Sequence, residues 1–354
     1  MTSTATHPRL QIGNASPCPR ARRMRRVWYG LLALAGGVML LVGTGLAPRG
    51  AAAQICTDVE PCMAQLQFGE TRRAREFAAK ILGERNDPKA LPVLTKALQS
   101  DPGEFVRANA ATALGLLTEP LSIDALLAAL KDDPSELVRG AAGEALGRFM
   151  DPRVQSPLSA ALAADPDHGV RAMAAESLGR IGAAPALPAL TTALAGDARV
   201  EVRVAAARAL GAIKAPGGLD VLKAVLGQDA DARVRGAVAD TLGKVPGDAI
   251  TEILVGALQA DTDRGVRLRI VRALGERRRQ EPVAVLIETL KSDPALDVRR
   301  ETIFALGKIG GSLALDALRY FAEKSVHQDL RKAAQQTLAD LPQGGAATSP
   351  TKAS

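Results

Sequence analysis

The chain repeats itself with a fixed period of 32 residues, and this repeat restricts its fold more than any other feature. An aspartate stands six residues before the middle seven of the recurring arginines, and a leucine stands seven residues after every one, from Leu82 to Leu338. The arginines are Arg75, Arg107, Arg139, Arg171, Arg203, Arg235, Arg267, Arg299 and Arg331, and the aspartates are Asp101, Asp133, Asp165, Asp197, Asp229, Asp261 and Asp293. A constant period between about 20 and 50 residues is typical of a solenoid, in which each unit packs on its neighbours.

The apolar residues within each unit predict two helices. In the second unit Leu91, Leu94 and Leu98 follow i, i+3, i+7 spacing, which places them on one face of a short helix, named helix A. Val106, Ala110 and Leu114 form a similar stripe on a second helix, named helix B. Asp-Pro pairs between the two helices predict a tight turn that begins helix B. We therefore expect an all-α superhelix (solenoid) of about nine helical hairpins.

Helix B also carries small residues on a second face. Positions equivalent to 108, 111 and 115 are mostly alanine or glycine, as in Gly140, Gly143 and Gly147. Glycine inside a helix costs about 1 kcal/mol relative to alanine. Its retention predicts that the B helices of neighbouring units approach closely.

The two ends of the array depart from the pattern, as the caps of a solenoid do. Gly69 takes the aspartate position in the first unit, and Ser325 takes it in the last. We assign residues 54–341 to one solenoid without a second domain. Residues 342–354 are small, polar and rich in helix breakers, which predicts a disordered tail.

The net charge of +7 belongs to the first 53 residues. That segment holds seven arginines and no acidic residue, and the remainder has 38 basic and 38 acidic residues. The repeat array is therefore neutral, which argues against a nucleic-acid partner.

Residues 1–53 have the three parts of an export signal: a basic segment at Arg20–Arg26, an apolar run at Trp28–Ala47 and Ala51-Ala52-Ala53 as a cleavage site. Arg25-Arg26 also resembles a twin-arginine signal loosely. The alternative is an uncleaved anchor, because about 20 apolar residues can span a bilayer. In both cases the array is expected in the periplasm or secreted, with a membrane involved only if the leader is retained.

Two cysteines remain after the leader, Cys56 and Cys62. An even pair in an oxidising compartment favours a disulfide that clips the N-terminal end of the array. The alternative is that Cys62 simply fills a core position of the first helix, since it stands one period before Leu94.

These units resemble HEAT repeats, specifically the short HEAT-like type named after phycobilin lyase subunits. Segments 132–148 and 165–182 carry the motif, and the resemblance covers residues 58–341. It implies a right-handed superhelix with the B helices on the concave side. It also implies that the aspartates and arginines form a ladder of hydrogen bonds that links adjacent units. In function it implies mostly protein scaffolding, and in a few branches chromophore attachment or metal-dependent hydroxylation.

The recurring arginines have a structural interpretation. Arg107 borders the apolar stripe of its helix and stands six residues after an aspartate, so we expect an ion pair at the seam between units. The predicted structural ladder comprises Asp101, Arg107, Asp133, Arg139, Asp165, Arg171, Asp197, Arg203, Asp229, Arg235, Asp261, Arg267, Asp293 and Arg299.

Residues for catalysis or metal binding are scarce. A hydroxylase-type iron site needs paired histidine and carboxylate ligands, but the array holds only His168 and His327, in distant units. With so few histidines, and with both cysteines expected to be oxidised, no Ser/His/Asp or Cys/His set is expected to assemble. We therefore expect no metal, no cofactor and no enzymatic activity.

The polar strip of helix B is the remaining candidate for binding. Its expected i, i+4 ion pairs are Glu144/Arg148, Glu176/Arg180, Asp240/Lys244 and Arg272/Glu276, which are compatible with an ordinary solvated face. The alternative is a mixed-charge surface for a protein or peptide. The candidate partner-binding residues are Arg148, Arg180, Arg208, Lys244, Arg269, Arg272, Phe304 and Lys308.

One region of this strip carries an excess of arginine. Residues 264–279 contain seven arginines, and Phe304 is an aromatic residue on the polar strip beside them. Arginine and aromatic side chains are favoured anchors of interfaces, so a hot spot would lie here; the alternative is a solvated run of charge. Apart from Arg267 in the ladder, we expect these arginines to be exposed.

Together these patterns predict a non-enzymatic scaffold outside the cytoplasm that grips a protein partner along its B helices. The alternative is an accessory protein like the phycobilin lyases, handling a tetrapyrrole or another ligand. Beyond residue 53 the chain has no tryptophan and a single tyrosine, Tyr320, which is poor material for an apolar ligand pocket.

Overall fold

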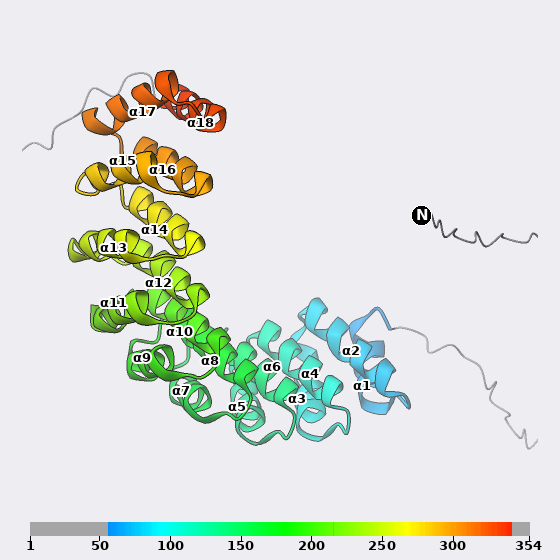
Figure 1. The fold of residues 1–354 in the computed structure, drawn as a ribbon. Coiled ribbons are helices and arrows are strands. Elements are labelled where there is room, and N and C mark those ends of the chain that lie inside the picture. Colours follow the sequence, from blue (N-terminus) through cyan, green and yellow to red (C-terminus); the bar gives the residue numbers. More distant parts are fainter. Residues whose placement is uncertain (1–55, 215, 342–354) are drawn as a thin grey trace, which may run out of the picture. The chain divides into compact units, whose positions relative to one another are not determined.

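The computed structural model describes residues 56–214 and 216–341, and these residues fold as a stack of helical hairpins. The chain divides into residues 1–51 and 52–354, and the described helices all belong to the second part. They contain no β-strand. Figure 1 shows the helices as successive pairs in chain order, which confirms the predicted all-α solenoid.

Each unit contributes one A helix and one B helix. The A helices are α1 (Val59–Phe68), α3 (Leu91–Ser100), α5 (Ile123–Asp132), α7 (Gln155–Ala164), α9 (Leu187–Gly196), α11 (Leu219–Gln228), α13 (Ala249–Ala260), α15 (Val283–Ser292) and α17 (Ser312–Lys324). The B helices are α2 (Arg72–Arg85), α4 (Glu104–Leu117), α6 (Glu136–Leu146), α8 (His168–Ile181), α10 (Val200–Ile213), α12 (Ala232–Lys244), α14 (Arg264–Arg277), α16 (Leu296–Ile309) and α18 (Gln328–Ala339).

Short 3₁₀ turns lead into five of the A helices. They are η1 (Pro88–Ala90), η2 (Pro120–Ser122), η3 (Pro152–Val154), η4 (Ala184–Ala186) and η5 (Pro216–Gly218). A proline lies in the first two positions of η1 to η4, where its missing N–H leaves no helical hydrogen bond unmade.

The core is a continuous column between the A and B layers. Leu94, Leu126, Leu158 and Leu190 on the A helices are fully buried, as are Leu114, Leu146 and Leu178 on the B helices. These are the positions of the two predicted apolar stripes. Because each unit contributes only a few such residues, it depends on both neighbours to exclude water from them.

Adjacent B helices approach through one glycine in each unit. A Cβ atom added at Gly115 would lie 2.6 Å from the Cβ of Ala145, and one at Gly179 would lie 2.7 Å from the Cα of Ala209. The same close approach recurs 30 residues apart along the array, for Gly83, Gly147, Gly211, Gly243, Gly275 and Gly307. The predicted contact between neighbouring units therefore exists at the position equivalent to 115.

At the glycines of the other two small positions, an added Cβ would not meet the backbone of a neighbouring helix, although one at Gly236 would lie 2.8 Å from the Arg269 side chain. A Cβ at Gly140 would meet nothing within 4 Å, and one at Gly143 would make only ordinary contact with Leu130 at 3.5 Å. The position equivalent to 143 also accepts the larger residues Val271 and Ile303 in later units, both fully buried. The close approach of the B helices therefore depends on the position equivalent to 115, where glycine is retained through eight units.

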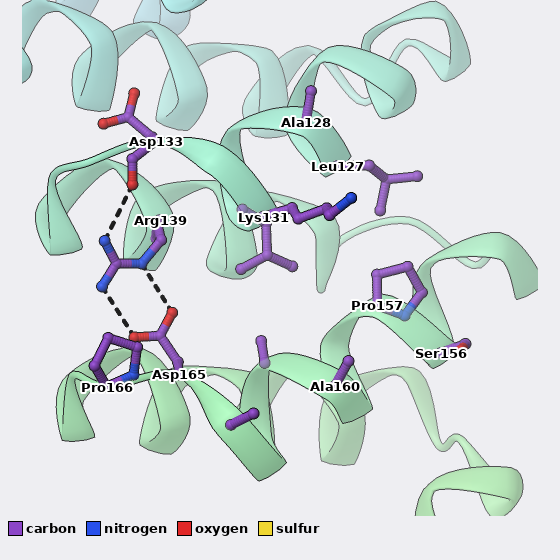
Figure 2. A pocket seen from close by; sticks show the side chains of 13 residues that line it. Leu127, Ala128, Lys131, Asp133, Arg139, Ser156, Pro157, Ala160, Asp165 and Pro166 are labelled. Atoms are coloured by element: carbon purple, nitrogen blue, oxygen red, sulfur yellow. Dashed lines mark hydrogen bonds and ion pairs between the residues drawn. The ribbon is translucent and has the colours of Figure 1, made fainter.

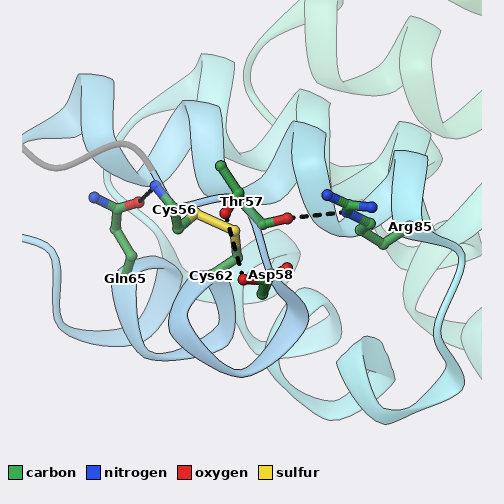
Figure 3. Close-up of a disulfide and its surroundings, with 6 residues drawn as sticks. All are labelled: Cys56, Thr57, Asp58, Cys62, Gln65 and Arg85. Carbon is green, nitrogen blue, oxygen red and sulfur yellow. Dashed lines mark hydrogen bonds between the residues drawn. A yellow bond between two sulfur atoms is a disulfide. The ribbon is translucent and has the colours of Figure 1, made fainter.

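A disulfide fastens the first described residues to α1. Cys56 and Cys62 lie with their sulfur atoms 2.09 Å apart, and both are buried (Figure 3). The backbone N–H of Cys56 donates to Gln65, and Arg85 at the end of α2 donates to the carbonyl of Thr57. Cys62 also occupies the core position predicted for it, so the two interpretations of this cysteine are compatible.

Two predicted segments lie outside the described residues, namely the leader at 1–53 and the tail at 342–354. Among the helices of residues 56–214 and 216–341, none is both long enough and apolar enough to cross a membrane.

The glycine contact predicts opposite effects for one substitution at two sites. Gly179→Ala should destabilise the array by about 1–3 kcal/mol, because the new methyl group would overlap the backbone of Ala209. Gly140→Ala should leave stability unchanged or raise it by up to about 1 kcal/mol, because it adds helix propensity in open space. Thermal melting followed by circular dichroism measures both, and equal melting temperatures for the two variants would contradict the assignment.

Candidate functional site

In the first seven units, the recurring arginine is bound to the aspartate of the following unit, 26 residues ahead. In Arg139 the Nε atom donates to Asp165 at 2.8 Å and a terminal nitrogen donates to the other carboxylate oxygen at 3.0 Å (Figure 2). Equivalent bidentate pairs join Arg75–Asp101, Arg107–Asp133, Arg171–Asp197, Arg203–Asp229, Arg235–Asp261 and Arg267–Asp293. These seven pairs form a ladder along the turns between A and B helices.

The aspartate six residues before each arginine has a different role from the one its spacing suggests. The remaining terminal nitrogen of Arg139 donates to the backbone carbonyl of Asp133 at 3.1 Å, not to its carboxylate. The carboxylate of Asp133 instead accepts from Arg107 and from the backbone N–H of Ser135. One guanidinium therefore joins the turn of its own unit to the turn of the next.

Both partners of each pair are largely removed from water. The side chains of Arg139 and Asp165 are only 11% and 6% exposed. Burial raises the pKa of Asp133, but the hydrogen bonds from Arg107 and Ser135 and the charges of Arg107 and Arg139 outweigh it, so its pKa lies below the ordinary value. The pKa values of Asp197 and Asp261 are lowered against burial in the same way.

The ladder stops where the partner residue is absent. Arg75 keeps its carboxylate partner, Asp101, and uses the carbonyl of Gly69, since only a backbone oxygen is required there. Arg299, which was predicted to belong to the ladder, instead donates to the carbonyl of Leu290, because Ser325 occupies the position of its acceptor. Arg331 of the last unit donates to the carbonyl of Ser325.

A pocket of about 710 Å³ lies beside the ladder, between the A helices of the third and fourth units. Figure 2 shows Leu127 and Ala128 of α5 on one side and Pro157 and Ala160 of α7 on the other, with Lys131 nearby. Its polar end is the pair of Arg139 and Asp165, and these groups already bind each other. The pocket is therefore on a different face from the predicted binding strip.

On the B-helix strip, most charges pair between helices and not along one helix. Glu144 and Arg148 form the expected i, i+4 pair at 3.4 Å. Asp240, however, binds Arg269 of the next helix and not Lys244. The expected pair of Arg272 and Glu276 is also replaced, because Arg272 binds Glu301 at 2.9 Å. The close approach at the glycines brings these long side chains within reach of the neighbouring helix.

The cluster of arginines at 264–279 is consequently less free than its sequence suggests. Arg264 pairs with Asp297 at 3.3 Å, and Arg279 pairs with Asp248 at 2.9 Å. Arg269 and Arg272 are exposed but ion-paired, and Lys308 binds Glu276. The cluster therefore cross-links successive units, and only part of its charge remains for a partner.

Arg277 differs most from expectation. It was expected to be exposed, but it is half-buried and donates to the backbone carbonyls of Leu242 and Val245, where α12 ends. Burial lowers its pKa, and the nearby charge of Arg279 adds to this effect. A sequence signal was available, because in seven other units the equivalent position holds an apolar residue, namely Leu117, Phe149, Ile181, Ile213, Val245, Ile309 and Leu341.

Four basic side chains of the strip, which we name the basic strip, come one from each of units three to six: Arg148, Arg180, Arg208 and Lys244. All four are exposed. Arg180 donates to the backbone carbonyl of Glu144. Among the described residues, Arg208 and Lys244 have no ion pair and no side-chain hydrogen bond. Phe304 is 39% exposed two units further on.

Within the described part of the chain, no group of three or more His, Cys, Asp and Glu side chains is arranged to hold a metal ion. His168 begins α8, and His327 precedes α18, so the two histidines lie in different units.

The profile of HEAT repeats matches residues 59–147, 123–200, 187–270 and 251–339. These overlapping matches cover most of the chain, so the protein belongs to the HEAT-repeat family, as the residue pattern predicted. No curated protein matches the chain by sequence.

Solved structures show the same fold at low sequence identity. The karyopherin Kap95p, in a structure with RanGDP, has a TM-score of 0.58 at 16% identity; the match covers 80% of this chain and 44% of that one. YibA of Escherichia coli has a TM-score of 0.50 at 21% identity, covering 77% and 100%. The CpcE–CpcF phycocyanin lyase of Nostoc sp. PCC7120 is also similar, with a TM-score of 0.36 at 20% identity, covering 83% and 99%.

The lowered pKa values of Asp133, Asp197 and Asp261 predict a loss of stability in acid. Because the folded pKa lies below the ordinary value of 3.8, the stabilisation is complete above that value and is lost as pH falls through the folded pKa. The melting temperature should therefore decrease as the pH is lowered below about 4. Asp197→Asn should flatten this fall, since amide side chains take up no proton in this range, and an unchanged slope would contradict the assignment.

Proposed function

We propose that this protein is a non-enzymatic scaffold that works outside the cytoplasm and binds a protein partner on the exposed face of its B helices. The observation that carries the proposal is how the array uses its charged groups. The ladder arginines are largely removed from water in pairs that hold units together, whereas Arg208 and Lys244 on the B-helix face have no ion pair or side-chain hydrogen bond within the described residues.

Two features of the same face support a protein ligand. Phe304 exposes an aromatic ring beside the paired arginines of α14, and aromatic and arginine side chains are frequent anchors of protein interfaces. The face is also repeated from unit to unit along successive B helices, which suits an extended contact and needs no enclosed pocket. The karyopherin Kap95p shows that a related solenoid binds a protein, RanGDP.

A location outside the cytoplasm is supported by the leader pattern of residues 1–53 and by the disulfide. The pair of Cys56 and Cys62 closes the N-terminal end of the array, and structural disulfides persist mainly in oxidising compartments. A non-enzymatic role is supported by the ladder, because its recurring acidic and basic side chains bind one another and are not free to act on a substrate.

The test is capture of proteins from the envelope fraction of the source organism. The B-face variant carries Arg208→Ala, Lys244→Ala and Phe304→Ala. The matched A-face variant carries Lys131→Ala, Lys223→Ala and Tyr320→Ala, which removes two exposed cations and one exposed aromatic from A helices. Circular dichroism should show that both variants fold.

The proposal predicts a protein that the wild type and the A-face variant retain and the B-face variant loses by at least about tenfold. Such a loss amounts to roughly 1.4 kcal/mol, which is within the effect of one or two interface anchors. Equal retention by the B-face variant would contradict the proposed face. A bound species absorbing visible light, with no captured protein, would instead favour a role like that of the phycobilin lyases.

A further inference from the structure

We propose that the basic strip binds an extended acidic peptide that presents a carboxylate at every third residue. This inference rests on the proposed function and specifies the partner of the same face. The basic strip supplies one cation from each of four successive units, through Arg148, Arg180, Arg208 and Lys244.

The spacing of these cations matches the spacing of an extended chain. Packed helices lie about 8–10 Å apart, and the glycine contacts place successive B helices in direct contact. An extended peptide advances about 3.3 Å per residue, so three residues cover about 10 Å. Carboxylates three residues apart in the peptide would therefore be separated by about the same distance as the cations of successive units.

The surface beside these cations is made of small or apolar side chains. Arg148, Arg180 and Lys244 are at equivalent positions of their units, and Arg208 lies one helical turn earlier. The position two turns before Arg148, Arg180 and Lys244, and one turn before Arg208, holds Ala141, Met173, Ala205 and Ala237 in units three to six, and the two later alanines are buried. These residues leave room for a peptide backbone to lie close to the B helices. The arrangement ends at unit seven, where Arg269 takes the same position and is engaged by Asp240 of unit six.

The local charge balance favours a negative ligand. Glu144 is engaged by Arg148, and the pair of Asp240 and Arg269 is neutral. Glu176 is the remaining carboxylate of the strip in these units, and it is exposed. The four cations of the basic strip therefore outnumber Glu144 and Glu176, which leaves two positive charges for the ligand to satisfy.

The probe is a fluorescent twelve-residue peptide with aspartate at every third position and glycine or serine between, titrated against the purified full chain at low salt. A peptide of the same composition with its four aspartates adjacent is the matched ligand, because it reaches fewer of the cations. The spaced peptide should bind about fivefold more tightly, as expected for the loss of one or two exposed ion pairs. Equal affinity for the two peptides would overturn the proposal.

Variants identify the surface. Changing Arg180, Arg208 and Lys244 to Gln should weaken binding of the spaced peptide at least about tenfold, and Glu176→Gln should strengthen it about twofold, because it removes an opposing charge. Lys131→Gln with Lys223→Gln removes exposed cations from the A helices and should leave the affinity unchanged. A triple variant that binds as well as wild type would overturn the proposal, and so would tighter binding of a twelve-residue oligothymidylate.

The failure of this inference is separable from failure of the proposed function. If the spaced peptide does not bind but envelope capture still loses a protein in the B-face variant, the acidic peptide is wrong and the binding face stands. If envelope capture depends only on the A-face residues, the proposed function is wrong whatever the peptide does.

Discussion

The solenoid depends on a bidentate bond between a guanidinium and a carboxylate from adjacent units. Each ladder arginine contacts two turns at once: the carboxylate of the next unit and the backbone carbonyl of its own. Each ladder aspartate in turn accepts a backbone N–H two residues ahead, which shapes the turn that begins helix B. Turn geometry and unit-to-unit contact are therefore maintained by the same few atoms.

A second contact is in register with the ladder. The arginine reaches 26 residues ahead, while the glycine near the end of each B helix meets a small side chain 30 residues ahead. Both distances hold only if every unit has the same length. This explains in physical terms why no insertion interrupts the period of 32 residues: one extra residue within a unit would displace the carboxylate from the guanidinium or place a larger side chain against the glycine.

Much of this architecture was predictable because the repeat samples each position many times. The helical hairpins, the leucine core and the contact at the position of Gly115 follow from columns of similar residues. The partner of each arginine was harder to predict, because Asp133 is only six residues from Arg139 in the sequence, whereas the actual partner, Asp165, is 26 residues away. The pairing of Asp240 with Arg269 was missed for the same reason, because it depends on the distance between helices. Arg277 was missed because its acceptors are backbone carbonyls, which are identical in every residue.

The proposed function rests on the difference between charged side chains that are ion-paired within the solenoid and charged side chains on the B helices that are not. The charged side chains at the turns pair with each other between units. Those on the B helices from unit seven onward mostly form ion pairs with the neighbouring B helix. Within the basic strip, Arg208 and Lys244 remain outside both networks, whereas Arg148 pairs with Glu144 and Arg180 donates to the Glu144 carbonyl. In this account, a partner meets a preformed surface, so binding requires little ordering of the protein.

The most direct test of this account is a double-mutant cycle across one rung of the ladder, using Arg139→Met, Asp165→Ala and the double variant. The free energy of unfolding is measured by urea denaturation for all four proteins. Each single variant should be destabilised, and the two changes should be coupled by at least about 1 kcal/mol, as is usual for residues in one hydrogen-bonded network. If the two effects simply add, to within about 0.5 kcal/mol, the bond between Arg139 and Asp165 does not stabilise the solenoid.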